Sequence, residues 1–395
     1  MTDLAAEFDA ISPEALHAAG HLKWTKFGPG VLGGFVAEMD FGTAPAVRAA
    51  LLDAIERDLL GYVPPTLVTE MGAACAEWCA ARYGWGVDPA DVHPLPDVLR
   101  GLEMAIQHCS RPGSPVILPV PAYMPFHTIP GKYDRSIIDV AMARDGGRWV
   151  YDLDALDAAF AAGGSLLVLC NPHNPLGRVM TPDEMLAIAA VVERHGGRVF
   201  SDEIHAPLVY APHRHVPYAT VSPAAAAHTV TATSASKAWN LPGLKCAQLI
   251  VSNDADRATM EANGVWFRHG AATIGVVANV AAYREGRDWI DGVVTYLDGN
   301  RRLLGTLLAD LLPEVGYEPP EGTYLSWLDF GALDLPDHLA AWFTAEAAVA
   351  MIDGYECGGP ACNGYVRLNF ATGRPILEQM VTSMAAAVRR HQQGG

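Results

Sequence analysis

The chain has 395 residues, of which half are apolar and 18% are charged, and this composition predicts a globular protein with two or three domain-sized units. Its formal net charge of −17 argues against a protein that holds nucleic acid or anionic lipid through a general basic surface. Any anion that the protein binds must therefore be held by a local site.

The amino-terminal segment does not resemble a secretion signal, because it has acidic residues where a signal peptide has basic ones and lacks a continuous apolar core. No charge-free stretch of 18 or more apolar residues occurs, so no membrane span is expected. The seven cysteines are scattered without paired CxxC motifs, which favours buried thiols over a metal site. These features together predict a cytoplasmic protein without a metal.

Short apolar runs alternate with amphipathic helical stretches through the middle of the chain. Residues 183–195 have helical apolar spacing, and Thr181 and Pro182 suit the N-cap and the first helical position. Repetition of strand, helix and strand predicts an α/β fold with a mostly parallel sheet covered on both faces. The predicted strands are 115–119, 165–170, 198–201, 229–233 and 246–251.

The carboxyl-terminal part of the chain has a different pattern. From about Tyr283 it has long helical stretches, which are followed by the strand-like segment 364–372. We therefore predict a large domain over residues 41–282 and a smaller α+β domain formed by residues 1–40 and 283–395. No linker-like or low-complexity run separates these parts.

Polar clusters follow three of the predicted strands directly. They are NPHNP at 171–175, DEIH at 202–205 and SASK at 234–237. In open α/β sheets, ligands bind where the carboxyl ends of the strands meet. The three clusters therefore predict one shared site.

Two charged residues in these clusters have environments that suit chemistry. Lys237 lies among small residues after a strand, where an amine can be reached by a carbonyl and desolvated enough to lose its proton. Asp202 ends an apolar strand, where a carboxylate is costly unless a cation, such as a protonated heterocyclic nitrogen, meets it. A surface lysine and a helix N-cap are the ordinary alternatives.

Other residues are candidates for binding an anion. Ser234 and Ser236 could supply hydroxyl donors to a phosphate, with Lys245 adding positive charge. Val98 and Leu99 precede an amphipathic run, so their backbone amides could lie at the N-terminus of a helix and bind phosphate there.

Five further residues have a functional and a structural interpretation, and the sequence leaves both open. Arg367, within the apolar run YVRLNF, could bind a substrate carboxylate or form a salt bridge. Asn174, between two prolines, could donate to a phenolate oxygen or simply form the turn. Tyr62 and Tyr123, beside turn prolines, could be a hydroxyl donor and a stacking ring or could pack at a rim. His205 could orient the nearby carboxylate or be an ordinary half-buried imidazole.

Taken in order, these motifs closely resemble those of fold-type I pyridoxal 5'-phosphate (PLP) enzymes of the class I/II aminotransferase family. The pattern SxSKxxNxxGL at 234–244 and the run RLNFA from Arg367 complete the set. Within the family, VAEMDF at 36–41 and EGTYLSWLD at 321–329 are most similar to the cystathionine β-lyase (PatB/MalY-type C–S lyase) branch. The resemblance spans roughly residues 24–375.

The resemblance implies a large domain with a seven-stranded, mostly parallel sheet, and a homodimer with shared sites. It implies that Lys237 holds PLP as a Schiff base and that Asp202 pairs with the pyridine nitrogen. Asn174 would bond the phenolic oxygen and lie near the substrate, Tyr123 would stack on the ring as part of the catalytic set, and His205 would belong to the cofactor site. The remaining implied contacts are Val98, Leu99, Ser234, Ser236 and Lys245 at the phosphate, Tyr62 from a second subunit, and Arg367 with backbone near Ala37 at the substrate α-carboxylate.

The implied reaction is β-elimination, which converts cystathionine or another cysteine S-conjugate, a small amino acid, into a thiol, pyruvate and ammonia. An aminotransferase or a decarboxylating reaction on an S-conjugated amino acid remains the alternative, because the same apparatus serves each. A DNA-binding regulator is disfavoured by the lack of a basic module. Three features depart from the family pattern: Asp97 at the phosphate turn, Pro207 where lyases often have an acid, and the unusual stretch 353–362.

Overall fold

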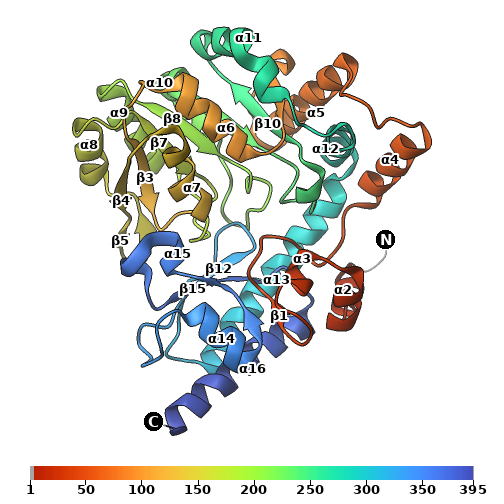
Figure 1. Cartoon of the computed structure of the whole chain (residues 1–395), viewed down its shortest axis with the longest axis vertical. Helices are drawn as coiled ribbons and strands as arrows, with labels where there is room; N and C mark the ends of the chain where they lie inside the picture. Colours follow the sequence, from red (N-terminus) through yellow and green to blue (C-terminus); the bar gives the residue numbers. More distant parts are fainter. Residues whose placement is uncertain (1–3, 395) are drawn as a thin grey trace. The chain divides into compact units, whose positions relative to one another are not determined.

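The computed structural model describes residues 4–394, and its contacts divide them into two compact units (Figure 1). One, here called the sheet unit, comprises Thr43–His173 and Arg178–Ile290. The other, here called the terminal unit, comprises the described residues before position 43, Asn174–Gly177 and the described residues from Asp291 on. The predicted domain boundaries at 40 and 283 remain a prediction.

A seven-stranded sheet lies at the centre of the sheet unit (Figure 1). Its order is β2-β10-β9-β8-β7-β3-β4, and β10 runs antiparallel to both of its neighbours while the other pairs are parallel. The predicted mostly parallel sheet is therefore confirmed. The strands are β2 (Val92–Leu95), β3 (Val116–Val120), β4 (Ile137–Ala141), β7 (Leu166–Cys170), β8 (Arg198–Asp202), β9 (Thr229–Thr233) and β10 (Ala247–Val251).

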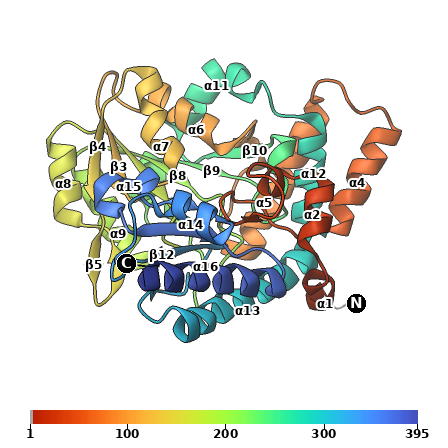
Figure 2. The same ribbon diagram turned by 60° about the horizontal axis from the view of Figure 1, so that its bottom comes forward.

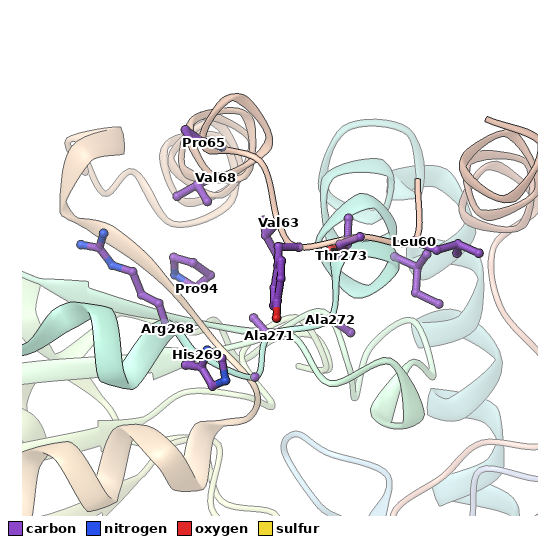
Figure 3. A pocket seen from close by; sticks show the side chains of 14 residues that line it. Leu60, Val63, Pro65, Val68, Pro94, Arg268, His269, Ala271, Ala272 and Thr273 are labelled. Atoms are coloured by element: carbon purple, nitrogen blue, oxygen red, sulfur yellow. Dashed lines mark hydrogen bonds between the residues drawn. The ribbon is translucent and has the colours of Figure 1, made fainter. Parts of the chain in front are cut away.

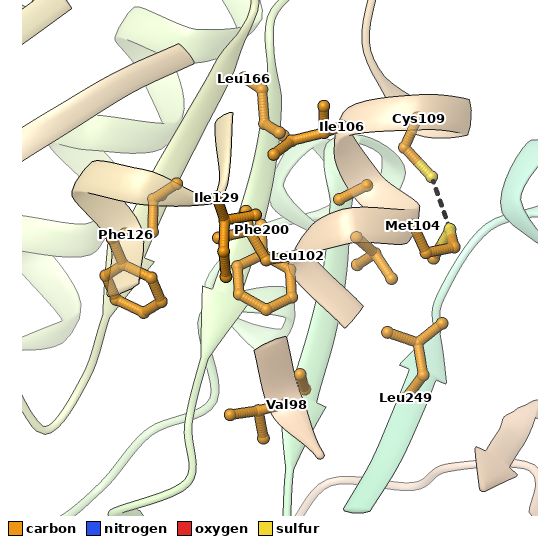
Figure 4. Packing of buried hydrophobic residues seen from close by; sticks show 14 of the residues in the cluster. Val98, Leu102, Met104, Ile106, Cys109, Phe126, Ile129, Leu166, Phe200 and Leu249 are labelled. Atoms are coloured by element: carbon orange, nitrogen blue, oxygen red, sulfur yellow. Dashed lines mark hydrogen bonds between the residues drawn. The ribbon is translucent and has the colours of Figure 1, made fainter. Parts of the chain in front are cut away.

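Helices cover both faces of this sheet because its central strands are apolar on both sides. Leu166 and Val168 of β7 belong to one apolar layer, which includes Phe200 and residues of α6 (Figure 4). Leu167 and Leu169 belong to a second layer, which includes residues of the helices on the other face. Side chains of successive strand residues point to opposite faces, so a continuous apolar run buries both. The helices of the first layer are α6 (Val98–Met104), the π-helical turn η2 (Ala105–Cys109), α7 (Met124–Thr128) and α11 (Asp254–Arg268), and those of the second are α8 (Leu153–Ala161), α9 (Pro182–Arg194) and α10 (Pro223–His228).

Helix α9 begins where the sequence predicts. The Thr181 hydroxyl accepts the Glu184 N–H at 3.2 Å, and the Glu184 carboxylate accepts the Thr181 N–H at 2.7 Å. This capping box satisfies two backbone donors at the helix start, and Pro182 occupies the first turn. The predicted helix and its N-cap are confirmed.

The sheet unit has further helices, helical turns and a hairpin, and two of the turns contribute Tyr133 and Tyr218 to the apolar layers. Helix α12 packs against α4 and α5. These elements are α4 (Pro45–Glu56), α5 (Pro65–Tyr83), η1 (Pro89–Asp91), η3 (Pro130–Tyr133), the hairpin of β5 (Ala143–Asp145) and β6 (Arg148–Val150), η4 (Tyr218–Thr220), η5 (Pro242–Leu244) and α12 (Thr273–Glu285).

The terminal unit is built on a four-stranded antiparallel sheet of order β11-β12-β15-β14. Strand β1 near the chain start pairs in parallel with β13. Helix α14 packs on α16 (Figure 2). No described helix has the length and apolar character needed to cross a membrane. The elements are α1 (Leu4–Asp9), α2 (Pro13–Ala19), α3 (Leu22–Thr25), β1 (Leu32–Gly33), α13 (Arg287–Leu311, which starts in the sheet unit), β11 (Gly316–Tyr317), β12 (Leu325–Asp329), α14 (Leu339–Ala347), β13 (Val349–Ala350), β14 (Ile352–Asp353), α15 (Tyr355–Gly358), η6 (Gly359–Cys362), β15 (Tyr365–Asn369) and α16 (Arg374–Gly394).

Candidate active site

The sheet aligns the carboxyl ends of three neighbouring strands. Asp202 at the end of β8 is in register with Cys170 at the end of β7 and with Ala232 near the end of β9. The Asn171 N–H donates to the Asp202 carbonyl at 3.0 Å, so the ladder continues to the point where the polar segments begin. These polar segments therefore start side by side, as the sequence predicts.

Asp202 is a buried carboxylate at this edge, and 3% of its surface is exposed. Its Oδ1 accepts the Ile204 N–H at 3.0 Å. Burial raises the pKa of Asp202 to about 7, and the negative charge of Glu203 adds to this rise, whereas the Ile204 N–H and the positive charge of Lys237 oppose it. A carboxyl in this state binds a further cation or N–H donor favourably.

Lys237 lies in the turn that follows β9 and is half-buried. Its neighbours Ala235 and Ala238 are fully buried, and the Ala235 N–H donates to Asn279 Oδ1 at 3.1 Å, which anchors the turn. The Lys237 ammonium lies near enough to Asp202 to lower the pKa of that carboxyl. The structure therefore brings these two predicted residues together.

The turn that carries Lys237 is shaped by Ser234. Its hydroxyl donates to the Cys246 carbonyl at 2.7 Å and accepts the Ser236 N–H at 2.9 Å. Its proton is thus committed to the backbone, which differs from the expectation that Ser234 donates to a phosphate. The half-buried Ser236 is the better placed of the two hydroxyls for such a role.

Asp97 is the N-cap of α6, which explains an acid at this position. Its Oδ1 accepts the Arg100 N–H at 3.1 Å, and its Oδ2 accepts from Lys245 Nζ at 3.2 Å. Both charged side chains are substantially exposed, so their ion pair is weak. Val98 is the first residue of α6, so its N–H lies at the helix N-terminus, as predicted.

Two aromatic candidates have different surroundings. Tyr123 is half-buried at the N-cap of α7, and together with Leu99 it packs against the apolar layer that contains α6. Its ring meets Phe126 edge to face at 5.5 Å. His205, in the turn after β8, is buried and accepts the Leu208 N–H through its carbonyl at 2.8 Å. Tyr123, Leu99 and His205 all lie in the sheet unit.

Tyr62 lies in the loop between α4 and α5, and 94% of its surface is exposed. It borders a groove of about 790 Å³ (Figure 3). The groove is formed by residues 60–68 on one side and 268–274 on the other, with Pro94 beside them. A tyrosine this exposed makes few ring contacts within its own chain.

Three further candidates lie in the terminal unit. Arg367 is in the middle of β15, and 2% of its surface is exposed. Its Nη1 donates to Asn174 Oδ1 at 3.1 Å, and its Nη2 donates to the Phe35 carbonyl at 2.8 Å. These two hydrogen bonds orient the guanidinium. The structure therefore brings Arg367 and Asn174 together.

The backbone around Ala37 is held by residues that the sequence reasoning missed. Asn369 Nδ2 donates to the carbonyls of Val36 at 2.7 Å and Glu38 at 2.6 Å, and the Tyr324 hydroxyl donates to the Ala37 carbonyl at 2.9 Å. Asn369 lies two positions after Arg367, so both side chains share one face of β15. This spacing of two residues within a predicted strand is the sequence feature that indicates Asn369 as a neighbour of Arg367.

Comparison with known proteins gives the family. The family model for aminotransferase class I and II matches residues 35–381. The chain belongs to this family. The predicted family membership is confirmed.

Relatives within the family are C–S lyases by name. The chain is 39% identical over 368 residues to cystathionine β-lyase from Corynebacterium glutamicum, with 93% of this chain and 96% of the relative covered. It is 32% identical to cystathionine β-lyase PatB from Bacillus subtilis, at 93% and 96% coverage. A solved structure from Corynebacterium diphtheriae, described as a PLP-dependent β-cystathionase, matches with a TM-score of 0.91 and 40% identity over 96% of this chain and 98% of that chain. The predicted fold type and the PatB/MalY branch are therefore confirmed.

Proposed function

We propose that this protein is a PLP-dependent C–S β-lyase that converts cystathionine or another cysteine S-conjugate into a thiol, pyruvate and ammonia. One observation carries the proposal: at the carboxyl edge of the sheet, a buried carboxyl ends one strand, and the turn after the neighbouring strand holds a half-buried lysine whose charge lowers the pKa of that carboxyl. The names of relatives that match nearly the whole chain support the same activity.

The residues at this edge fit PLP chemically. Asp202, whose pKa is raised to about 7 mainly by burial, gains from a protonated pyridine nitrogen, which offers both a positive charge and an N–H donor. The N-terminus of α6, the Ser236 hydroxyl and the Lys245 ammonium supply the donors that a phosphate requires. In this proposal, Ser234 supports the phosphate site indirectly by holding the turn.

Lys237 has two roles in the proposal. PLP, joined through its aldehyde to the Lys237 amine, supplies a ring that accepts the electrons left at the substrate Cα. Once the incoming amino acid has freed this amine, Lys237 Nζ acts as the general base that takes the Cα proton. With the cofactor bound, Asp202 would hold the positive charge on the ring nitrogen, which favours this withdrawal of electrons. The sulfur group would leave Cβ as a thiol, and water would hydrolyse the remaining three-carbon fragment to pyruvate and ammonia.

The other candidates bind and orient. We assign Tyr123 to ring stacking, Asn174 to the phenolic oxygen and His205 to the cofactor site beside Asp202. Arg367 binds the substrate α-carboxylate, since a planar guanidinium fits a carboxylate in a bidentate manner, and its hydrogen bonds to Asn174 and to the Phe35 carbonyl orient it. The backbone near Ala37 assists, because Tyr324 and Asn369 hold it in place.

We further propose a homodimer in which Tyr62 reaches the partner's site. Leu52, Ile55 and Leu60, on α4 and the loop after it, are 52%, 51% and 62% exposed, and Tyr62 follows in the same loop. A group of exposed apolar side chains suits a protein interface. Sedimentation equilibrium tests this: we expect the mass of two chains, and Leu52→Glu should shift the equilibrium toward one. We propose the cytoplasm as the location, because all seven cysteines are buried free thiols.

The decisive experiment incubates the purified protein with a panel of cysteine S-conjugates and measures thiol and pyruvate. Lys237→Ala should reduce both by at least about 10³-fold and should abolish borohydride-reducible covalent PLP, whereas Lys132→Ala, at an exposed lysine, should match the wild type. Amino transfer to a 2-oxo acid without thiol release would make the protein an aminotransferase and refute the lyase proposal.

A further inference from the structure

Glu203, the residue after Asp202, has a buried carboxylate surrounded by donors. Its Oε1 accepts from the Ser201 hydroxyl at 2.9 Å and from the Tyr218 N–H at 2.9 Å. Its Oε2 lies 2.8 Å from His215 Nε2. Glu203 is 3% exposed and His215 is 6% exposed. Three donors from three segments therefore converge on one carboxylate.

The surroundings of His215 indicate which group carries the charge. Its Nδ1 is buried and has no hydrogen-bond partner among the described residues. An imidazolium would leave an unsatisfied N–H at that atom, so we assign a neutral ring that donates its Nε2–H to Glu203. The ring also meets Tyr83 edge to face at 5.0 Å. Glu203 is then an ionised carboxylate stabilised by hydrogen bonds rather than by a full positive charge.

The other titratable groups near Glu203 respond to a negative charge there. Burial raises the pKa of Tyr83, and Glu203 adds to that rise. A hydrogen bond between Cys79 and Cys75, both on helix α5, raises the pKa of Cys79 together with burial, and Glu203 again contributes. On the other side of Glu203, the pKa of Asp202 is raised to about 7 chiefly by burial, with Glu203 acting in the same direction and Lys237 opposing it. The field of Glu203 thus reaches the candidate cofactor site.

We propose that Glu203 is a positioning residue for the proton on the cofactor's ring nitrogen: three buried donors hold the Glu203 carboxylate in place, and its negative charge supplements that of Asp202. A proton between a ring nitrogen and a carboxylate is held more tightly when a second negative charge lies nearby. Glu203 touches neither the cofactor nor the substrate in this role and acts through Asp202. The inference rests on the proposed function, because it requires PLP with its nitrogen at Asp202.

The test follows the ring nitrogen directly. Holoenzyme loaded with PLP that is ¹⁵N-labelled at the ring nitrogen is titrated, and the nitrogen chemical shift reports its protonation. We expect the wild type to keep the protonated shift to a higher pH than Glu203→Gln, by on the order of one pH unit, which is the size of effect that a nearby opposite charge has in a protein. An unchanged titration in Glu203→Gln would overturn the proposal.

Variants of His215 make the test independent of Glu203→Gln and carry it alone if that variant does not fold. His215→Phe removes one donor and should give a smaller shift in the same direction, and His215→Gln restores an N–H donor and should return the titration toward that of the wild type. His228→Phe is the matched control, because His228 is also buried and its Nε2 shares a hydrogen bond of 3.0 Å with the Tyr218 hydroxyl. Equal shifts in His228→Phe and His215→Phe would show general loosening and refute the role.

This test separates the inference from the proposed function. If the wild-type protein binds no PLP, no signal from bound cofactor appears and the proposed function fails together with the inference. If the wild type binds PLP and releases thiol and pyruvate while Glu203→Gln leaves the nitrogen titration unchanged, only the inference fails. Thermal melts of each variant identify changes that arise from lost stability.

Discussion

Two buried aspartates, one in each unit, have their charges met in different ways. Asp40 in the terminal unit accepts from Lys23 Nζ at 2.9 Å and from Trp24 Nε1 at 2.8 Å. The side chains of Lys23 and Asp40 are 1% and 3% exposed, so this is a buried ion pair. Asp202 in the sheet unit accepts the Ile204 N–H, and burial raises its pKa to about 7.

The difference separates a structural carboxylate from a candidate binding group. The chain supplies a cation in direct contact with Asp40, so desolvation of the carboxylate is offset within the fold. Asp202 has its pKa raised despite the charge of Lys237, so ionisation there has a net cost that an added cation can remove. A perturbed carboxyl at a sheet edge is the kind of group that occurs at functional sites. Substitutions at each aspartate can sharpen or break this contrast.

The largest expected effect on stability is at Asp40. Lys23→Met keeps most of the side-chain volume but leaves a buried carboxylate without its cation, and we expect a loss of about 3–5 kcal/mol of unfolding free energy at pH 7. Denaturant unfolding measures it. Adding Asp40→Asn to Lys23→Met should recover part of the loss, because the unpaired charge is removed. Lys132→Met, at an exposed position, should change stability by less than about 0.5 kcal/mol.

A loss below about 1 kcal/mol in Lys23→Met would contradict the view that Asp40 is held by a structural ion pair. The contrast between the two aspartates would then disappear, since neither would depend on a cation in the chain.

Substitution of Asp202 is expected to raise the stability of the cofactor-free protein rather than lower it. Because its folded pKa of about 7 lies above the unfolded value near 3.8, the folded cofactor-free protein binds the extra proton between these values, and stability falls as the pH rises from about 4 to about 7. The full penalty above pH 7 is on the order of 2–4 kcal/mol. Asp202→Asn should therefore make the cofactor-free protein more stable than the wild type at pH 8 by about this amount, with little difference near pH 4.

Unfolding of both cofactor-free proteins in denaturant at several pH values measures this difference. The same variant should lose most lyase activity, because its amide cannot hold positive charge on a ring nitrogen. If the unfolding free energies of the two proteins depended on pH in the same way, ionisation of Asp202 would have no free-energy cost in the folded protein. If Asp202→Asn were less stable than the wild type at pH 8, the charge of Asp202 would be fully compensated within the chain, like that of Asp40.

Much of the fold and part of the site follow from local sequence. The apolar runs of β7 and β8 and the capping residues of α9 specify their structures within a few positions, so the sequence is sufficient to place them. Asp202 and Lys237 are recognisable because Asp202 ends an apolar strand and Lys237 lies in the short segment after the next strand. Their proximity then follows from the parallel arrangement of the sheet.

The parts that the sequence did not predict depend on contacts between distant segments. The partners of Glu203 include His215 and Tyr218, which lie in a later loop and a short helical turn with no periodic pattern. The sequence predicts that Ser234 donates to a phosphate, whereas its hydroxyl donates to the carbonyl of Cys246, just before β10. This contact depends on the folded turn and cannot be read from the sequence. The N-cap role of Asp97 depends only on neighbouring residues, but the family resemblance predicts this position beside the phosphate and does not reveal the cap.

Arg367 extends the contrast to a buried cation. Arg367→Lys should weaken substrate binding, because a lysine cannot form the bidentate pair with a carboxylate or reach both of the acceptors that orient the guanidinium. We expect KM for a cysteine S-conjugate to rise roughly 10- to 100-fold, which is about 1.4–2.7 kcal/mol, with a smaller change in kcat. Steady-state kinetics measures it. Arg302→Lys, on the exposed side of α13, should behave as the wild type, and an unchanged KM in Arg367→Lys would favour a structural role for Arg367.

The smallest expected effect is at Asn369, which supports the site without carrying charge. Asn369→Ala leaves the carbonyls of Val36 and Glu38 without their shared donor, and we expect a loss of about 1–2 kcal/mol in stability together with a few-fold rise in KM, because the backbone beside Ala37 is less well held. Asn363→Ala removes an exposed hydrogen bond to Asp337 and should change neither quantity measurably. If Asn369→Ala lowered stability and left KM unchanged, the 36–38 backbone would belong with Asp40 as part of the scaffold rather than with Arg367 as part of the substrate site.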